Sequence, residues 1–161
     1  MSLNTLLLLW MAMVVGEKKN NKGRNYGHLK GLENVKEVVT NLIKLKIPIV
    51  TFYVFSSENW KRPKKEIRYL FGLINKYFSL ELENVIKQGI KLNIVGELNR
   101  LPSNIKKTLK KSMQLTKKNK KILVNLAINY GSRKEIFNAI KKIKNKKNFK
   151  NFEKELFSSK Q

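Results

Sequence analysis

The sequence predicts an α/β fold, built as an open parallel sheet with helices on both faces. Three apolar runs rich in β-branched residues, over about 47–56, 91–96 and 122–129, predict strands. Segments with apolar residues at helical spacing separate these runs. Strands that alternate with helices are joined by right-handed crossovers, so we expect the three strands to be parallel neighbours covered by the helices.

Apolar spacing defines four helices. The first, from about residue 31 to 46, has its stripe at Val35, Val38, Val39, Leu42 and Ile43. The second begins near Pro63, a residue suited to the first turn of a helix, and runs to Lys87. Its stripe consists of Ile67, Leu70, Phe71, Ile74 and Phe78. A basic helix over about 104–118 and a last clear helix over about 132–145 complete the pattern.

The run "IPIVTFYVFS", residues 47–56, is the strongest strand signal. It is β-branched and aromatic and has no polar alternation. Such a run is typical of a strand that is buried on both faces of a parallel sheet. We therefore expect it to lie in the interior.

Length and composition predict one domain over residues 1–161. Hydrophobic residues make up 42% of the 161 residues and aromatic residues 9%, which argues against disorder. The absence of cysteine excludes disulfides, and a single histidine argues against a zinc site. This composition fits a reducing compartment, and we expect a cytoplasmic protein.

The chain is strongly basic, with a formal net charge of +24. An excess of this size is common in proteins that bind nucleic acid. Here it is mostly lysine accompanied by asparagine and isoleucine, as in "KKNKK", which indicates A-rich codons and solvated helix faces. We expect no nucleic-acid partner, and we keep a basic binding module for nucleic acid or anionic membrane as the alternative function.

The opening run "LLLLWMAMVV", residues 6–15, is apolar in an otherwise lysine-rich chain. Ten residues suit the apolar region of a signal peptide but cannot span a bilayer, which needs about 20. No basic residue precedes the run and no small-x-small cleavage site follows it. A buried strand is the better interpretation.

The segment "FSSENWKRP", residues 55–63, follows the strongest strand directly. Ligands of open α/β sheets bind at the carboxyl ends of the strands. Hydroxyl, carboxylate, amide, indole and guanidinium groups gather there within a few positions, and Arg62 suits bidentate binding of a phosphate. The alternative is a plain loop whose Ser and Asn side chains cap the next helix.

Arg24 and His28 stand four residues apart in "GRNYGH", just before the first predicted helix. If that helix begins there, both side chains share a face beside an N-terminal dipole, which favours anions. A lone histidine can equally be a structural hydrogen bonder. The spacing alone leaves the role of this pair open.

Together these segments resemble a known family. "GHLKGLENVKEVV", "YVFSSENWKRPKKEI", "NIVGELNRL" and "LVNLAINYGSRKEI" are similar to the cis-prenyltransferases, in particular the bacterial undecaprenyl diphosphate synthases. The order and spacing match from about Lys18 to Asn145. The resemblance implies an enzyme that elongates farnesyl diphosphate with isopentenyl diphosphate on Mg²⁺ while the product grows into an apolar tunnel.

The resemblance also implies roles for single residues. Arg24 and His28 match the family's contacts to the allylic diphosphate. The family's loop after the strand is matched by Ser56, Ser57, Glu58, Asn59, Trp60 and Arg62. Asn59 stands at the position assigned to proton removal, and because an amide is a weak base we expect relay through a hydroxyl or the diphosphate.

Two departures from the family pattern concern the ends of the active site. The family's first strand ends in an Asp-Gly-Asn-Gly-Arg-Trp loop whose Asp holds Mg²⁺, but this chain has "MAMVVG" there. The chain also stops before the family's Arg-Thr-x-Gly-Glu-x-Arg-x-Ser segment, which supplies the isopentenyl diphosphate site. We therefore expect one incomplete domain with its C-terminal part missing and with no metal ligand.

The first departure has an explanation at the level of codons. Trp10, Met11, Ala12 and Met13 require TGG ATG GCN ATG. When the frame is moved back by a single nucleotide, residues 10–16 permit Met-Asp-Gly-Asn-Gly-Arg-Trp, with the Asp and both Gly fixed whatever the wobble bases are. We interpret the run as a buried strand and catalytic loop translated out of frame, and we expect residues 6–13 to keep a strand-like place.

Two function classes follow. The first is a cis-prenyltransferase that makes a polyprenyl diphosphate for carrier-lipid synthesis, inactive in the chain as written. It implies contact with the membrane through the lipid product. Because members of the family dimerise, it also implies a homodimer. The second is a non-catalytic protein, either the basic binding module or a degenerate partner subunit.

Overall fold

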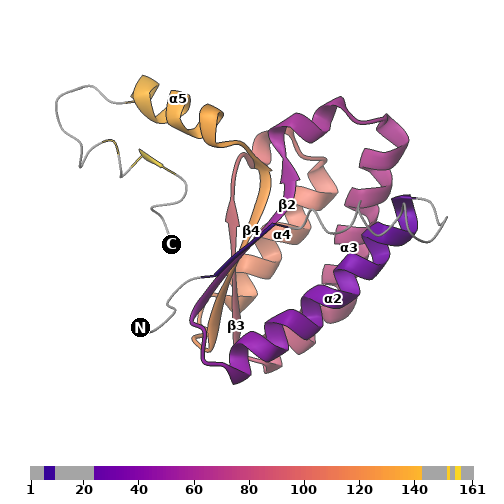
Figure 1. Ribbon diagram of the computed structural model, residues 1–161, viewed down its shortest axis with the longest axis vertical. Helices are drawn as coiled ribbons and strands as arrows, with labels where there is room; N and C mark the ends of the chain where they lie inside the picture. Colours follow the sequence, from indigo (N-terminus) through magenta and orange to yellow (C-terminus); the bar gives the residue numbers. More distant parts are fainter. Residues whose placement is uncertain (1–5, 10–23, 143–151, 153–154, 157–161) are drawn as a thin grey trace.

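The protein is a four-stranded parallel sheet with helices packed against it (Figure 1). The computed structural model describes residues 6–9, 24–142, 152 and 155–156. The strands are β1 (Leu6–Leu9), β2 (Ile49–Ser56), β3 (Ile90–Val95) and β4 (Ile122–Tyr130), in the order β1-β2-β4-β3. The predicted parallel neighbours over 47–56, 91–96 and 122–129 are confirmed as β2, β3 and β4.

The apolar opening forms an edge strand. β1 pairs in parallel with β2, from Leu6 opposite Val50 to Leu9 opposite Tyr53. This confirms the expected strand-like place for residues 6–9, whereas residues 10–13 lie outside the described residues.

Each connection between strands contains a helix. The α-helices are α2 (Arg24–Lys44), α3 (Lys64–Lys87), α4 (Ser103–Thr116) and α5 (Ser132–Lys142), and the short 3₁₀ helices are η1 (Ser57–Lys61) and η2 (Leu98–Arg100). The predicted start of the first helix near residue 31 is wrong, because α2 begins at Arg24. Gly27 and Gly31 lie in its first turns and lower the local helix propensity, which hid that end of the helix.

The core lies between the sheet and helices α2, α3 and α4. Figure 1 shows these helices together on one side of the sheet and α5 on the other. The core side chains of β2 and β4 include Val50, Phe52, Val124 and Leu126, and they pack against the apolar stripes of the helices. Burial of this continuous apolar surface is the main stabilising contribution to such a fold.

The opposite face of the sheet is polar at its centre. The side chain of Asn125, fully buried on β4, donates to Thr51 Oγ1 at 3.2 Å and accepts from Asn93 at 2.9 Å. The expectation of burial on both faces is therefore wrong for β2, where buried and half-buried residues alternate, but it describes the central strand β4. Among the described residues, none of the helices is both long and apolar enough to cross a membrane.

Candidate active site

The loop that follows β2 is closed by Asn59. The Asn59 side-chain oxygen accepts a hydrogen bond from the backbone N–H of Ser56 at 3.0 Å, and its backbone oxygen accepts from the N–H of Arg62 at 3.1 Å. The short helix η1 lies between Ser56 and Arg62, the two residues whose N–H groups Asn59 binds. Pro63 follows and precedes the first residue of α3. The predicted loop residues thus stand in one compact turn at the carboxyl end of a parallel strand.

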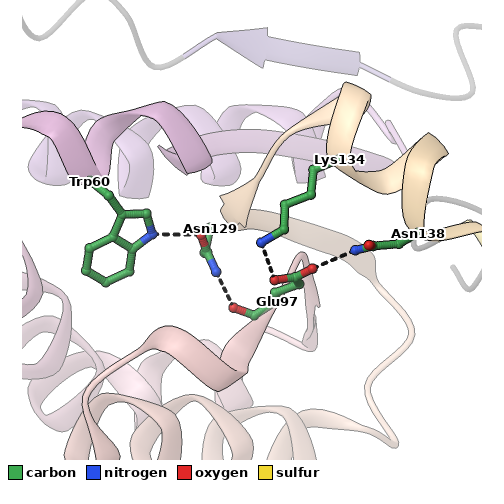
Figure 2. A network of polar contacts seen from close by, with 5 residues as sticks. All are labelled: Trp60, Glu97, Asn129, Lys134 and Asn138. Carbon is green, nitrogen blue, oxygen red and sulfur yellow. Dashed lines mark hydrogen bonds and ion pairs between the residues drawn. The ribbon is translucent and has the colours of Figure 1, made fainter.

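Trp60 is the anchor of this loop. Its indole packs against Phe55 and Phe71, with ring centroids 5.1 and 5.7 Å away. The Arg100 guanidinium lies 5.5 Å from the centre of the indole, in a cation–π contact. The indole Nε1 donates to Asn129 Oδ1 at 2.8 Å (Figure 2). Contacts from β2, α3, η2 and β4 therefore fix this one side chain.

The carboxyl ends of β3 and β4 are tied together beside Trp60. Asn129 Nδ2 donates to the backbone oxygen of Glu97 at 2.7 Å. The Glu97 carboxylate accepts from Lys134 at 2.6 Å and from Asn138 at 2.7 Å, both on α5 (Figure 2). The segments "NIVGELNRL" and "LVNLAINYGSRKEI" contain Glu97 and Asn129, but no local pattern distinguishes these two residues, because their partners lie far away in the chain.

Arg62 is held by a carboxylate. Its Nη1 forms an ion pair with Glu66 Oε1, four residues along, at 3.0 Å. A guanidinium has five N–H donors, so one such contact orients the group and leaves donors for a phosphate. The predicted phosphate contact is compatible with this geometry, and Glu66 is a further site residue that the sequence reasoning missed.

The β4–α5 turn presses on the start of the loop. A Cβ on Gly131 would lie 2.3 Å from Ser57 Oγ, a distance that real Cβ atoms essentially never show. Gly131 thus allows the two segments to approach closely. The preceding residue, Tyr130, donates its phenol hydrogen to Glu135 at 2.7 Å, and burial together with this carboxylate raises the pKa of Tyr130 above its ordinary value. Tyr130 is therefore a protonated donor at neutral pH.

The predicted site residues differ in their exposure to solvent. Ser56, Ser57, Asn59, Trp60 and Arg62 are half-buried, whereas Glu58 is exposed. Arg24 and His28 lie in the first turns of α2, and their side chains are outside the described part of the structure. Because α2 connects two parallel strands, it runs antiparallel to them. Its N-terminus therefore lies toward the carboxyl ends of the strands, where the loop is.

An apolar cavity of about 50 Å³ opens between α2, α3 and the sheet. Its walls come from Val35, Val39, Phe78, Val85, Leu92 and Leu126, among others. An ion pair between Lys36 and Glu81, 3.0 Å long, joins the two helices beside it, and Asn84 donates to the same carboxylate at 2.9 Å. These bonds hold the pKa of Glu81 below its ordinary value. The cavity lies on the helix-covered face and further toward the amino ends of the strands than the loop.

The described residues include no group of three or more His, Cys, Asp or Glu side chains able to hold a metal ion. Near the loop, the carboxylates of Glu66 and Glu97 are engaged by Arg62 and Lys134. The position that the family pattern gives to its metal-binding aspartate falls at Met11, outside the described residues.

Comparisons with known proteins agree on one family. A family model described as "Putative undecaprenyl diphosphate synthase" matches residues 16–161, directly after the apolar opening run. An isoprenyl transferase of Rickettsia bellii is 43% identical over 124 residues, which cover 77% of this chain and 55% of that protein. One of Halalkalibacterium halodurans is 39% identical over 126 residues, covering 78% and 49%. The chain thus spans about half the length of these curated relatives.

Solved structures show the same fold. A probable undecaprenyl diphosphate synthase from Campylobacter jejuni matches with a TM-score of 0.74 and 28% identity, over 98% of this chain and 70% of that one. A lavandulyl diphosphate synthase from Lavandula x intermedia, in complex with dimethylallyl diphosphate, matches with a TM-score of 0.91 and 21% identity, over 98% and 72%. On the strength of the family model and the relatives, the chain belongs to the undecaprenyl diphosphate synthase family of cis-prenyltransferases.

Proposed function

We propose that this chain binds farnesyl diphosphate, with the diphosphate at the carboxyl ends of the strands and the hydrocarbon tail directed toward the cavity between α2 and α3. The observation that supports the proposal is the presence of a polar loop and an apolar cavity in the same domain. The loop over Ser56–Arg62 offers hydroxyl, amide and guanidinium donors. The cavity on the helix-covered face offers almost only apolar walls. An amphiphilic ligand with a charged head and a long apolar tail fits that pair.

The head group is bound by donors that converge on the loop. Arg62 is oriented by Glu66, and the Ser56 and Ser57 hydroxyls stand at the start of η1. The N-terminus of α2, with Arg24 and His28 in its first turns, points to the same edge and attracts anions. Charge-assisted bonds of this kind contribute about 1.5–3 kcal/mol each.

In the reaction we propose for the whole enzyme, the allylic C–O bond breaks and the diphosphate leaves. A C–C bond forms to the double bond of isopentenyl diphosphate, which then loses a proton. The carbocation-like allylic group is protected in a water-poor apolar pocket. Asn59 positions the proton acceptor, because its side-chain oxygen is already bonded to the Ser56 N–H and an amide is a weak base. We assign the proton to a hydroxyl or to the diphosphate.

In the family, magnesium supplies charge stabilisation for the leaving diphosphate. The described residues of this chain contain no group of three or more His, Cys, Asp or Glu side chains that could hold the ion. We therefore assign no step to a metal in this chain. The proposal includes the expectation that the 161-residue chain, made as printed, does not turn over. Incubation with Mg²⁺, farnesyl diphosphate and labelled isopentenyl diphosphate should give no labelled polyprenyl product, and clear incorporation would contradict this expectation.

Calorimetry with farnesyl diphosphate tests the binding proposal. Arg62→Gln should weaken binding roughly ten-fold, because one charge-assisted contact is lost. Arg68→Gln is the matched control, since Arg68 is an exposed arginine on α3, outside the loop. This variant should change the affinity by less than about two-fold. Equal affinities for the two variants would remove Arg62 from the site. Absence of binding combined with a salt-sensitive nucleic-acid complex would favour the alternative of a basic binding module.

A further inference from the structure

Asn129 occupies an unusual place at the end of β4. It is 2% exposed, and its backbone has a positive φ of 52°. Few side chains adopt that conformation at low cost, and asparagine, aspartate and glycine are the usual ones. At this buried position the backbone conformation and the two side-chain hydrogen bonds together require an asparagine. An ordinary core position requires only an apolar side chain of suitable size.

We propose that Asn129 is a positioning residue, which holds the Trp60 indole in the substrate loop and fixes that loop to the end of β3. The inference rests on the proposed function, because it makes Trp60 part of the farnesyl diphosphate site. The indole has a single donor, and Asn129 Oδ1 receives it at 2.8 Å.

The ring contacts of Trp60 do not by themselves set its orientation. Phe55 and Phe71 contact the indole edge-on or at a tilt, and Arg100 lies over it. Such contacts tolerate sliding of one ring over another, because they are only weakly directional. The hydrogen bond that Nε1 donates to Asn129 Oδ1 removes this freedom. Asn129 therefore selects one orientation of an indole that the aromatic cluster would otherwise hold loosely.

The other half of the Asn129 amide extends the connection to α5. Nδ2 donates to the Glu97 backbone oxygen at 2.7 Å, while the Glu97 N–H donates to the backbone oxygen of Asn129 at 3.4 Å. The Glu97 carboxylate in turn binds Lys134 and Asn138 on α5 (Figure 2). One amide thus connects the loop, the end of β3 and, through Glu97, the helix that follows β4.

A set of variants on the full chain tests the inference, with Trp10→Phe as the background so that Trp60 is the one remaining tryptophan. Asn129→Gly keeps the backbone conformation and removes the amide. Asn129→Asp keeps an oxygen that accepts from the indole, but an ionised aspartate loses the donor to the Glu97 backbone oxygen. Asn125→Ala is the matched control, since it removes a buried amide from the same strand that bonds to Thr51 and Asn93 and not to the loop.

Tryptophan fluorescence is the readout that does not depend on a ligand. In Asn129→Gly, water replaces the amide beside the indole, so emission should move to longer wavelength and acrylamide quenching should rise. Asn129→Asp and Asn125→Ala should keep the parental spectrum. An unchanged spectrum in folded Asn129→Gly, or the same shift in Asn125→Ala, would overturn the inference.

Affinity for farnesyl diphosphate gives the second readout. Asn129→Gly should weaken binding about five- to ten-fold. Asn129→Asp should restore part of the loss, because it keeps the acceptor for the indole but not the donor to Glu97. Asn125→Ala should leave the affinity within about two-fold. In a Trp60→Phe background, Asn129→Gly should have little further effect, because the donor is already gone. A full additional loss there would show that Asn129 acts elsewhere. If the parent chain does not bind farnesyl diphosphate, the proposed function fails, and the fluorescence still decides whether Asn129 holds the indole.

Discussion

The loop at the carboxyl edge of the sheet and the cavity between α2 and α3 are held in different ways. In the loop, the single side chain of Trp60 makes two ring contacts, a cation–π contact and a hydrogen bond. Its four partners belong to four different elements. Beside the cavity, the described residues of α2 and α3 are joined by the partly exposed ion pair Lys36–Glu81 together with apolar contacts. Under the proposed function, the directional bonds would fix the loop that binds the charged diphosphate, and the apolar walls would accept the hydrocarbon tail.

The largest expected effect comes from removing the ring that lies between the core and the loop. Phe55, 1% exposed, touches both Trp60 and Phe71. Phe55→Ala should lower the free energy of unfolding by about 3–5 kcal/mol, as typical for a buried phenylalanine. Phe78→Ala, on the cavity wall, should fall at the lower end of that range, because the ring already borders empty space.

Urea unfolding of both variants checks this ranking, and farnesyl diphosphate titration adds a second comparison. Phe55→Ala should weaken binding by releasing Trp60, whereas Phe78→Ala enlarges the cavity and should retain binding. A larger loss of stability in Phe78→Ala than in Phe55→Ala would contradict the view that the loop is the more tightly determined region.

A smaller effect is expected where the loop meets the β4–α5 turn. The Cβ of Gly131→Ala would overlap Ser57 Oγ, so one of the two segments must move. We expect a loss of about 1–3 kcal/mol, as for other overpacked sites. The control is Gly72→Ala on α3, where a Cβ meets nothing within 4 Å and where alanine should add about 0.5–1 kcal/mol to stability. Chemical denaturation distinguishes them by sign, and a stabilised Gly131→Ala would show that the approach is looser than described.

The smallest effect belongs to the ion pair beside the cavity. Bonds from Asn84 and Lys36 lower the pKa of Glu81 from its ordinary value of 4.5. A lowered carboxyl pKa in the folded state stabilises the protein above the ordinary value and loses that contribution as pH falls through the folded value. Because the pair is partly exposed, its worth is at most about 1 kcal/mol.

Glu81→Gln is the matching variant for this pH dependence. Its stability should fall below that of the parent at pH 7 and should approach the parent as pH is lowered below 4.5. Urea unfolding at several pH values measures the difference. A constant difference across this range would mean that Glu81 acts through packing and not through its charge.

Local pattern determined most of the fold. The strands at β2, β3 and β4 and the helices between them were predictable because apolar periodicity depends on neighbouring residues in the chain. The loop residues from Ser56 to Arg62 were predictable as a group because polar side chains directly after a buried strand must stand at the sheet edge. Codon reasoning about residues 10–16 stays a prediction, while the apolar strand at Leu6–Leu9 is confirmed.

Only the tertiary structure decided what holds the loop in place. Trp60 and Asn129 are 69 residues apart in sequence, and Asn129 and Glu97 are 32 apart, so no local pattern shows that these side chains meet. The need for glycine at position 131 arises from Ser57, which lies in η1 and is distant in the sequence. The first turns of α2 form despite two glycines. Sequence periodicity fixes which face of an element is apolar, but hydrogen bonds between distant segments depend on how the parallel strands align, and that alignment is set by the whole sheet.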